Sequence, residues 1–133
     1  GTQWFGEAGN SQKMKLVLNA WLISMMQGIA ESAQLAKTLG FTPDQLWSAL
    51  EGGPLAAPYV KVKLDAIASE QFTPQMQLAH ALKDARLALS LAEPHTMPGL
   101  ENIAELWQQA ADAGYAGEDL SAVYQWLSPS SKA

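Results

Sequence analysis

The feature that most constrains the fold is an uninterrupted helical pattern near the start of the chain. It begins at Asn10 or Ser11, either of which can cap a helix, and runs to Leu39, after which Gly40 supplies a common stop. At 1.5 Å per residue this predicts a helix of roughly 40 Å. Because apolar side chains cover most of its circumference, we expect it to be buried on most sides. Those side chains form two stripes, one of Met14, Val17, Leu18, Trp21, Met25 and Ile29, the other of Leu16, Ala20, Ile23 and Ala30.

Helical spacing continues through the rest of the chain, and no convincing strand alternation occurs. Residues 42–45 and 73–75 are strong helix starts, each with a threonine N-cap, a proline in the first turn and a glutamine placed to close the cap. The further predicted helices are residues 42–51, 58–69, 73–93, 99–113 and 120–127, with a loop at residues 94–98 and a frayed tail at residues 128–133. The sequence therefore predicts a single all-α domain over residues 1–133, a bundle of about six helices around the long first one.

Composition excludes several classes of function. The 133 residues are 48% hydrophobic and 16% charged, typical of a folded domain with less charge than usual. Eight lysines and arginines and a net charge of −5 leave no basic surface for nucleic acid. Cysteine is absent, and His80 and His95 lie in different predicted segments, so we expect no metal site. The longest apolar stretch, Leu16 to Met26, is about half a bilayer span, which favours a cytoplasmic domain that does not enter a membrane.

Lys15 and Asn19 are the first candidate site residues. They lie one turn apart on one face of the predicted helix, and residues 20–26 that follow are nearly all apolar. An ammonium group among apolar neighbours gives up its proton more readily, which suits it to proton transfer. A solvated lysine and a buried amide bonded to nearby backbone are the alternatives at these positions. Lys13 points elsewhere and is read as an ordinary surface charge.

A second polar cluster lies on the predicted fourth helix. His80 and Asp84 are four residues apart with Lys83 beside them, and Met76 is expected one turn earlier on the same face. Such a cluster is usually a solvated helix face. Trp21 on the first helix is the best candidate for a residue packed against a partner chain.

Three motifs resemble those of the β-hydroxyacid dehydrogenases, a family that includes 3-hydroxyisobutyrate dehydrogenase and the glyoxylate/succinic semialdehyde reductases. Gly9, Lys15 and Asn19 have the spacing of the family's first helix signature, within a segment whose turn at residues 6–10 is also similar. Residues 83–89 resemble its second helix signature and residues 117–123 its C-terminal ending. The motifs occur in the family's order over nearly the whole chain.

The resemblance covers only the C-terminal half of that family, whose members carry a Rossmann domain before it. It implies an all-α fold like the C-terminal domain of 6-phosphogluconate dehydrogenase, with the Rossmann domain absent from this chain. It also implies that the first helix packs in a homo-oligomer, a dimer or a tetramer. We therefore expect this chain by itself to be inactive.

The resemblance also implies a role for each candidate residue. Lys15 would be the catalytic lysine, which exchanges a proton with the substrate oxygen, and Asn19 would bind the substrate, a small hydroxyacid or its semialdehyde. Lys83, Asp84 and Met76 would lie at the cofactor, NAD or NADP, which supplies the hydride. Met76 stands where family members often have phenylalanine, and a thioether fills similar apolar space.

A non-enzymatic dimerisation module of the same fold is the alternative function. Some relatives in this family lose the catalytic lysine, and the retention of both Lys15 and Asn19 argues for the enzyme.

Overall fold

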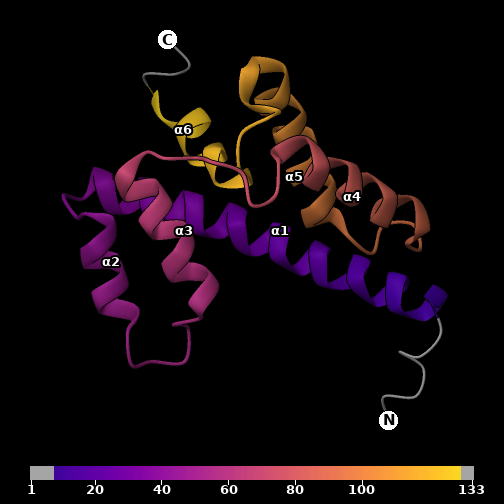
Figure 1. The fold of residues 1–133 in the computed structure, drawn as a ribbon, viewed down its shortest axis with the longest axis horizontal. Coiled ribbons are helices and arrows are strands. Elements are labelled where there is room, and N and C mark those ends of the chain that lie inside the picture. The colour runs from indigo at the N-terminus through magenta and orange to yellow at the C-terminus, as the bar shows by residue number, and fades with distance from the viewer. Residues whose placement is uncertain (1–7, 130–133) are drawn as a thin grey trace.

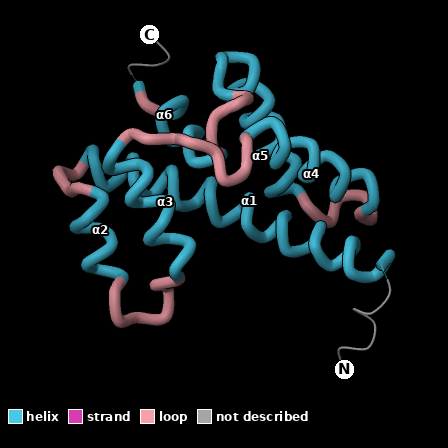
Figure 2. The backbone as a smooth tube through the Cα atoms, viewed as in Figure 1, coloured by secondary structure: helices cyan, strands magenta, loops and turns pink. Residues whose placement is uncertain are grey.

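The computed structural model describes residues 8–129, and these form a helical bundle (Figure 1). Figure 2 shows helices joined by loops, and the one strand-like pairing among these residues is an isolated antiparallel bridge between Gln77 and Asp119. The α-helices are α1 (Ala8–Thr38), α2 (Pro43–Leu50), α3 (Pro58–Ser69), α4 (Leu78–Leu91), α5 (Pro98–Ala110) and α6 (Val123–Leu127). The predicted all-α fold around a long first helix is confirmed.

The long helix α1 is the axis on which the other elements are arranged. It contacts each of the other five α-helices. In Figure 1, α4 and α5 lie along its N-terminal half, and α2 and α3 form a pair beside its C-terminal half. Helix α2 begins as predicted, because the Gln45 amide donates to Thr42 Oγ1 (3.1 Å) while the Thr42 amide donates to Gln45 Oε1 (2.9 Å).

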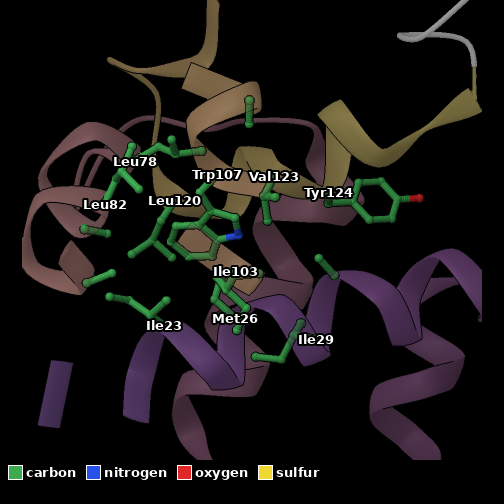
Figure 3. Packing of buried hydrophobic residues seen from close by; sticks show 14 of the residues in the cluster. Ile23, Met26, Ile29, Leu78, Leu82, Ile103, Trp107, Leu120, Val123 and Tyr124 are labelled. Carbon is green, nitrogen blue, oxygen red and sulfur yellow. The ribbon is translucent and has the colours of Figure 1, made fainter. Parts of the chain in front are cut away.

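The core lies between α1, α4, α5 and the C-terminal segment, and Trp107 of α5 is at its centre (Figure 3). The indole is fully buried, and its Nε1 donates to Gln27 Oε1 on α1 at 2.7 Å. Gln27 in turn donates to Glu31 Oε2 at 2.6 Å. This buried polar chain is satisfied by hydrogen bonds, so it fixes how α5 lies on α1. The fully buried apolar side chains that surround it include Ile23, Met26, Leu78, Leu120 and Val123.

The prediction that the fourth helix begins at residues 73–75 is wrong. Helix α4 begins at Leu78, and Gln77 before it has extended backbone. The amides of Gln75 and Met76 donate to the Asp119 carboxylate at 2.9 and 3.3 Å instead of entering a helical turn. Met76 therefore lies in the extended segment before α4, and not one helical turn before His80.

The C-terminal region also differs from the prediction in detail. Helix α5 passes at Ala110 into a π-helical turn, Ala111–Tyr115, where Gly114 has a φ of 109° that favours glycine. The predicted sixth helix consists of a 3₁₀ turn, Leu120–Ala122, followed by α6.

Ser128 was predicted to belong to a frayed tail, and this is wrong. Its side chain is buried, and Gln34 of α1 donates to both Ser128 Oγ and the Tyr124 carbonyl at 2.9 Å. Residues 130–133 of the predicted tail lie outside the described residues, as do residues 1–7, which include the first two residues of the turn at 6–10.

The N-terminal half of α1 is open on one side, so the prediction of burial on most sides is wrong for this chain by itself. Val17 and Leu18 are each 59% exposed and Trp21 is 71% exposed, whereas Ile23 and Met26 are fully buried. The first stripe is therefore divided. Ile29 is buried in the core and Met25 is partly buried against it, whereas no described element of this chain covers Val17, Leu18 and Trp21. No helix in residues 8–129 carries an apolar stretch that could cross a bilayer.

Candidate functional site

Two of the predicted site residues meet where α1 and α4 pack together. The side-chain nitrogen Nδ2 of Asn19 donates to Asp84 Oδ2 at 2.8 Å, across 65 positions of sequence. Both side chains are partly buried. The amide group has two N–H donors and one oxygen acceptor, so this bond fixes the orientation of Asn19 and leaves it further capacity to bind a ligand. Hydrogen bonds to an ionised carboxylate are stronger than neutral ones.

Asp84 is the hydrogen-bond acceptor of this junction and has His80 nearby. His80 Nε2 lies 3.8 Å from Asp84 Oδ2, one turn earlier on α4. The His80 side chain is 60% exposed and that of Asp84 is 19% exposed. The carboxylate therefore lies at the boundary between the helix packing and solvent, and it contacts Asn19 directly. The position of Asp84 at the cofactor, which the resemblance implied, stays a prediction.

Lys15 lies one turn before Asn19 on the same face of α1, and its side chain is exposed in this chain. The helical domain alone does not build the apolar surroundings expected for it. Residues 20–26 are apolar, yet the ones that pack inward, Ile23 and Met26, lie further along the helix. Any burial of the Lys15 amine must come from atoms outside the described residues 8–129.

Lys83 and Met76 both precede Asp84 in the chain. Lys83 is exposed on α4, next to Asp84. Met76 is partly buried against the core, in the extended segment before α4. The structure places Met76, Lys83 and Asp84 in one continuous stretch of chain, and joins only Asp84 to Asn19 by a described hydrogen bond.

An apolar groove of about 760 Å³ lies on the other flank of α1. Val17 and Trp21 line it from α1, and Leu91 and Met97 line it from the α4–α5 side. At 3.6 residues per turn, a residue two positions further along a helix points roughly 200° away. Val17 and Trp21 therefore face away from Lys15 and Asn19. Leu16 and Ala20 also line the groove and lie between these two faces, so the groove and the polar junction are neighbouring features of the α1–α4 contact.

Sequence reasoning missed a buried ion pair between Lys63 of α3 and Asp119. Both residues are 2% exposed, and Lys63 Nζ lies 2.9 Å from Asp119 Oδ2. Asp119 Oδ2 also accepts from the amide and the hydroxyl of Ser121, and Oδ1 accepts from two amides in residues 75–76. A signal for Lys63 exists in the sequence, because Val60 and Ile67, three positions before it and four after it, put it on the apolar face of α3.

The surroundings of Asp119 favour its charged form. Burial by itself raises the pKa of this carboxyl, but hydrogen bonds from Ser121, Lys63 and the Gln75 amide outweigh burial and lower the pKa to about 2. Tyr59 lies beside the pair, and its ring centroid is 5.4 Å from Lys63 Nζ. Burial, followed by the negative charge of Asp119, raises the pKa of the Tyr59 hydroxyl. Asp119 is therefore an anion at neutral pH. Across residues 8–129, no group of three or more acidic or histidine side chains is placed to hold a metal ion.

The sequence of this chain is similar to that of known proteins. The family described as the NAD-binding domain of NADP-dependent 3-hydroxyisobutyrate dehydrogenase matches residues 9–127. Glyoxylate/succinic semialdehyde reductase 2, chloroplastic, of Arabidopsis thaliana is 35% identical over 126 residues, which are 93% of this chain and 35% of that protein. Cytokine-like nuclear factor N-PAC of Aedes aegypti is 36% identical over 123 residues, 91% of this chain and 22% of that protein.

A solved structure gives the same result at the level of the fold. The 3-hydroxyisobutyrate dehydrogenase of Mycobacterium tuberculosis, solved with L-serine, superposes with a TM-score of 0.78 and 28% identity. The alignment covers 90% of this chain and 44% of that one. The chain thus spans less than half the length of each of these proteins.

Proposed function

This chain belongs to the NADP-dependent 3-hydroxyisobutyrate dehydrogenase family, and we propose that it is the helical half of an NAD(P)-dependent oxidoreductase. The proposed reaction interconverts a small 3-hydroxy acid and its semialdehyde. The observation that carries the proposal is the hydrogen bond between Asn19 and Asp84, one helical turn from Lys15. This hydrogen bond joins residues of two separate motifs at a partly buried junction. Such a contact between distant motif residues supports a shared role for them.

The chemistry divides between the cofactor and the chain. The nicotinamide cofactor supplies or accepts the hydride. Lys15 donates a proton to the substrate carbonyl oxygen in reduction and takes one from the hydroxyl in oxidation. Asn19, held by Asp84, binds the substrate through its second N–H or its oxygen. These groups supply orientation and a proton.

The residues proposed for the cofactor fit a dinucleotide in character. The partly buried thioether of Met76 is an apolar surface against which a flat ring can pack, and the exposed ammonium of Lys83 suits an anionic nucleotide. Both NAD and NADP satisfy this description, since neither residue reads the ribose. We propose that a dinucleotide-binding domain outside this chain completes the site and covers Lys15.

An activity panel on the full-length protein tests this proposal. Small semialdehydes and glyoxylate are each combined with NADH and NADPH, and nucleotide oxidation is followed by absorbance. We expect turnover with at least one combination, and none from residues 1–133 alone. A folded full-length protein that oxidises neither nucleotide with any of these substrates would contradict the enzymatic proposal. Turnover by the helical chain alone would contradict the need for a second domain.

A non-enzymatic interaction module is the second candidate. It is favoured by the similarity to N-PAC, whose name describes a nuclear factor and not an enzyme. A negative activity panel combined with stable self-association would support this alternative. The cytoplasmic location stays a prediction, because the names of the two relatives refer to the chloroplast and the nucleus.

We further propose that the protein is a homo-oligomer, a dimer or a tetramer, that buries the open flank of α1. The support is the apolar groove together with Trp21, the kind of large, exposed aromatic residue that dominates binding energy at interfaces. Substituting Trp21→Glu should weaken self-association at least about tenfold, because a buried glutamate must lose its hydration. Leu55→Glu is the matched control, since Leu55 is equally exposed at 72% and lies in the loop between α2 and α3. Sedimentation of the variants measures the effect, and a monomeric parent protein would refute this mode of assembly.

A further inference from the structure

We propose that the buried Lys63–Asp119 pair is a positioning element for the cofactor side of the site. It holds residues 72–77, and with them Met76, against residues 118–121. The inference rests on the proposed function in one respect, which is that Met76 contacts the nicotinamide cofactor. We call this positioning element, the Lys63–Asp119 pair with the segments that it joins, the clamp. Whether the clamp exists can be tested without measuring any enzymatic activity.

A single carboxylate joins three segments of the chain. Asp119 Oδ1 accepts from the amides of Gln75 and Met76, at 2.9 and 3.3 Å. Its other oxygen accepts from Lys63 Nζ at 2.9 Å and from the amide of Ser121 at 3.0 Å. Helix α3, the extended segment and the start of the 3₁₀ turn therefore meet at one side chain.

Backbone hydrogen bonds extend this junction in both directions. The Asp119 amide donates to the Phe72 carbonyl at 2.9 Å, and the Leu120 amide donates to the Met76 carbonyl at 2.9 Å. The Leu78 amide, the first of α4, donates to the Glu118 carbonyl at 2.8 Å. Both the amide and the carbonyl of Met76 are thus bonded to residues 119–120. The same ladder fixes where α4 begins, and α4 carries Asp84.

Stability alone does not account for a charged pair at this place. Replacing a buried ion pair by apolar residues of similar volume is often neutral or stabilising, because desolvation of the two charges opposes their attraction. What an apolar pair cannot supply is an acceptor for the amides of residues 75 and 76, which then lose their partner. Lys63 keeps the Asp119 carboxylate charged and oriented toward the amides of residues 75 and 76. The carboxylate in turn fixes the path of the backbone through Met76.

The experiment compares two variants of the full-length protein. Lys63→Met combined with Asp119→Leu removes both charges at similar volume, so no unpaired buried charge remains to unfold the domain. Lys63→Arg keeps the charge and is the conservative control. Two quantities are measured, the hydrogen exchange of the Gln75 and Met76 amides and the steady-state constants for the reduced nucleotide.

In the double variant we expect these two amides to exchange at least about tenfold faster, while the core amides of Ile23 and Met26 keep their parental rates. We also expect the KM for the nucleotide to rise about tenfold, because the contact between Met76 and the nucleotide is lost. The kcat should stay within about twofold of the parental value, because Lys15 is unchanged. In the Lys63→Arg variant, the exchange rates of the two amides and the KM for the nucleotide should both stay near the parental values. If the pair only stabilised the fold, its removal would lower the melting temperature and leave the KM of the folded enzyme unchanged.

The outcomes separate the two proposals. Unchanged exchange at Gln75 and Met76 would overturn the clamp, and faster exchange with an unchanged KM would overturn its role in cofactor positioning. A parent protein without turnover would sink the proposed function, and the positioning role with it, whereas amide exchange would still decide whether the clamp exists. If the double variant does not fold, Lys63→Met combined with Asp119→Asn gives the same two readouts, because it also removes both charges and leaves no unpaired buried ion.

Discussion

Substituting Lys15→Ala is expected to lower the turnover of the full-length protein by about 10²–10⁴-fold, the loss that follows removal of a general acid, which is the role proposed for Lys15. The fold is expected to be unaffected, because the Lys15 side chain is exposed and contributes nothing to the core. Steady-state kinetics with the best substrate from the activity panel measures the effect, and circular dichroism checks the fold.

Two further variants show what the loss means. Lys15→Arg keeps the positive charge but carries a guanidinium that stays protonated in proteins, so it should lose activity nearly as severely. Lys37→Ala is the matched control, an exposed lysine in the last turn of the same helix, and it should turn over normally. Near-parental turnover of Lys15→Ala would remove this amine from the mechanism, and full activity of Lys15→Arg would replace proton transfer by simple charge binding.

Substituting Trp107→Ala lowers the free energy of unfolding by about 3–5 kcal/mol, the range found for large aromatic residues removed from a core. The side chain is fully buried, and its loss also deprives Gln27 Oε1 of its donor. For a domain of this size the melting temperature should fall by roughly 10–20 °C. Thermal unfolding followed by circular dichroism measures the shift.

Trp107→Phe separates the two contributions. It keeps an aromatic ring and removes the indole N–H, so its cost should be smaller and should come in large part from the unpaired Gln27 oxygen. A Trp107→Ala variant that melts within a few degrees of the parent would mean that α5 is not anchored to α1 through this residue.

Local chemistry explains where the sequence predicted the fold correctly. The capping box at Thr42 involves groups three residues apart, so its geometry depends on nothing distant. The similar pattern at Thr73 failed because Asp119, more than forty residues later, accepts from the amides of residues 75 and 76, which a Thr73 cap would otherwise have bonded. A competitor of that kind is visible only after the chain has folded.

The candidate site was predictable in its members and not in its contacts. Asn19 and Asp84 each stood out in their own helix, but their hydrogen bond depends on how α1 and α4 cross. Lys63 was overlooked because a lysine on a helix is usually solvated, although its spacing from Val60 and Ile67 marks the apolar face. The hydrophobic spacing of α1 also did not predict which of its apolar side chains the rest of the chain would bury.

The polar junction and the apolar groove share helix α1, and this has a mechanical consequence. An α-helix with its side chains is about 10–12 Å across, so an occupant of the groove that packs on Val17 and Trp21 lies within about one helix diameter of Asn19. Helices displace as rigid bodies when neighbours repack, because close-packed interiors do not absorb small shifts gradually. If the proposed assembly and the proposed role of Lys15 both hold, a subunit that packs differently against Val17 and Trp21 would also change where Lys15 points, and assembly would then influence the rate of the reaction.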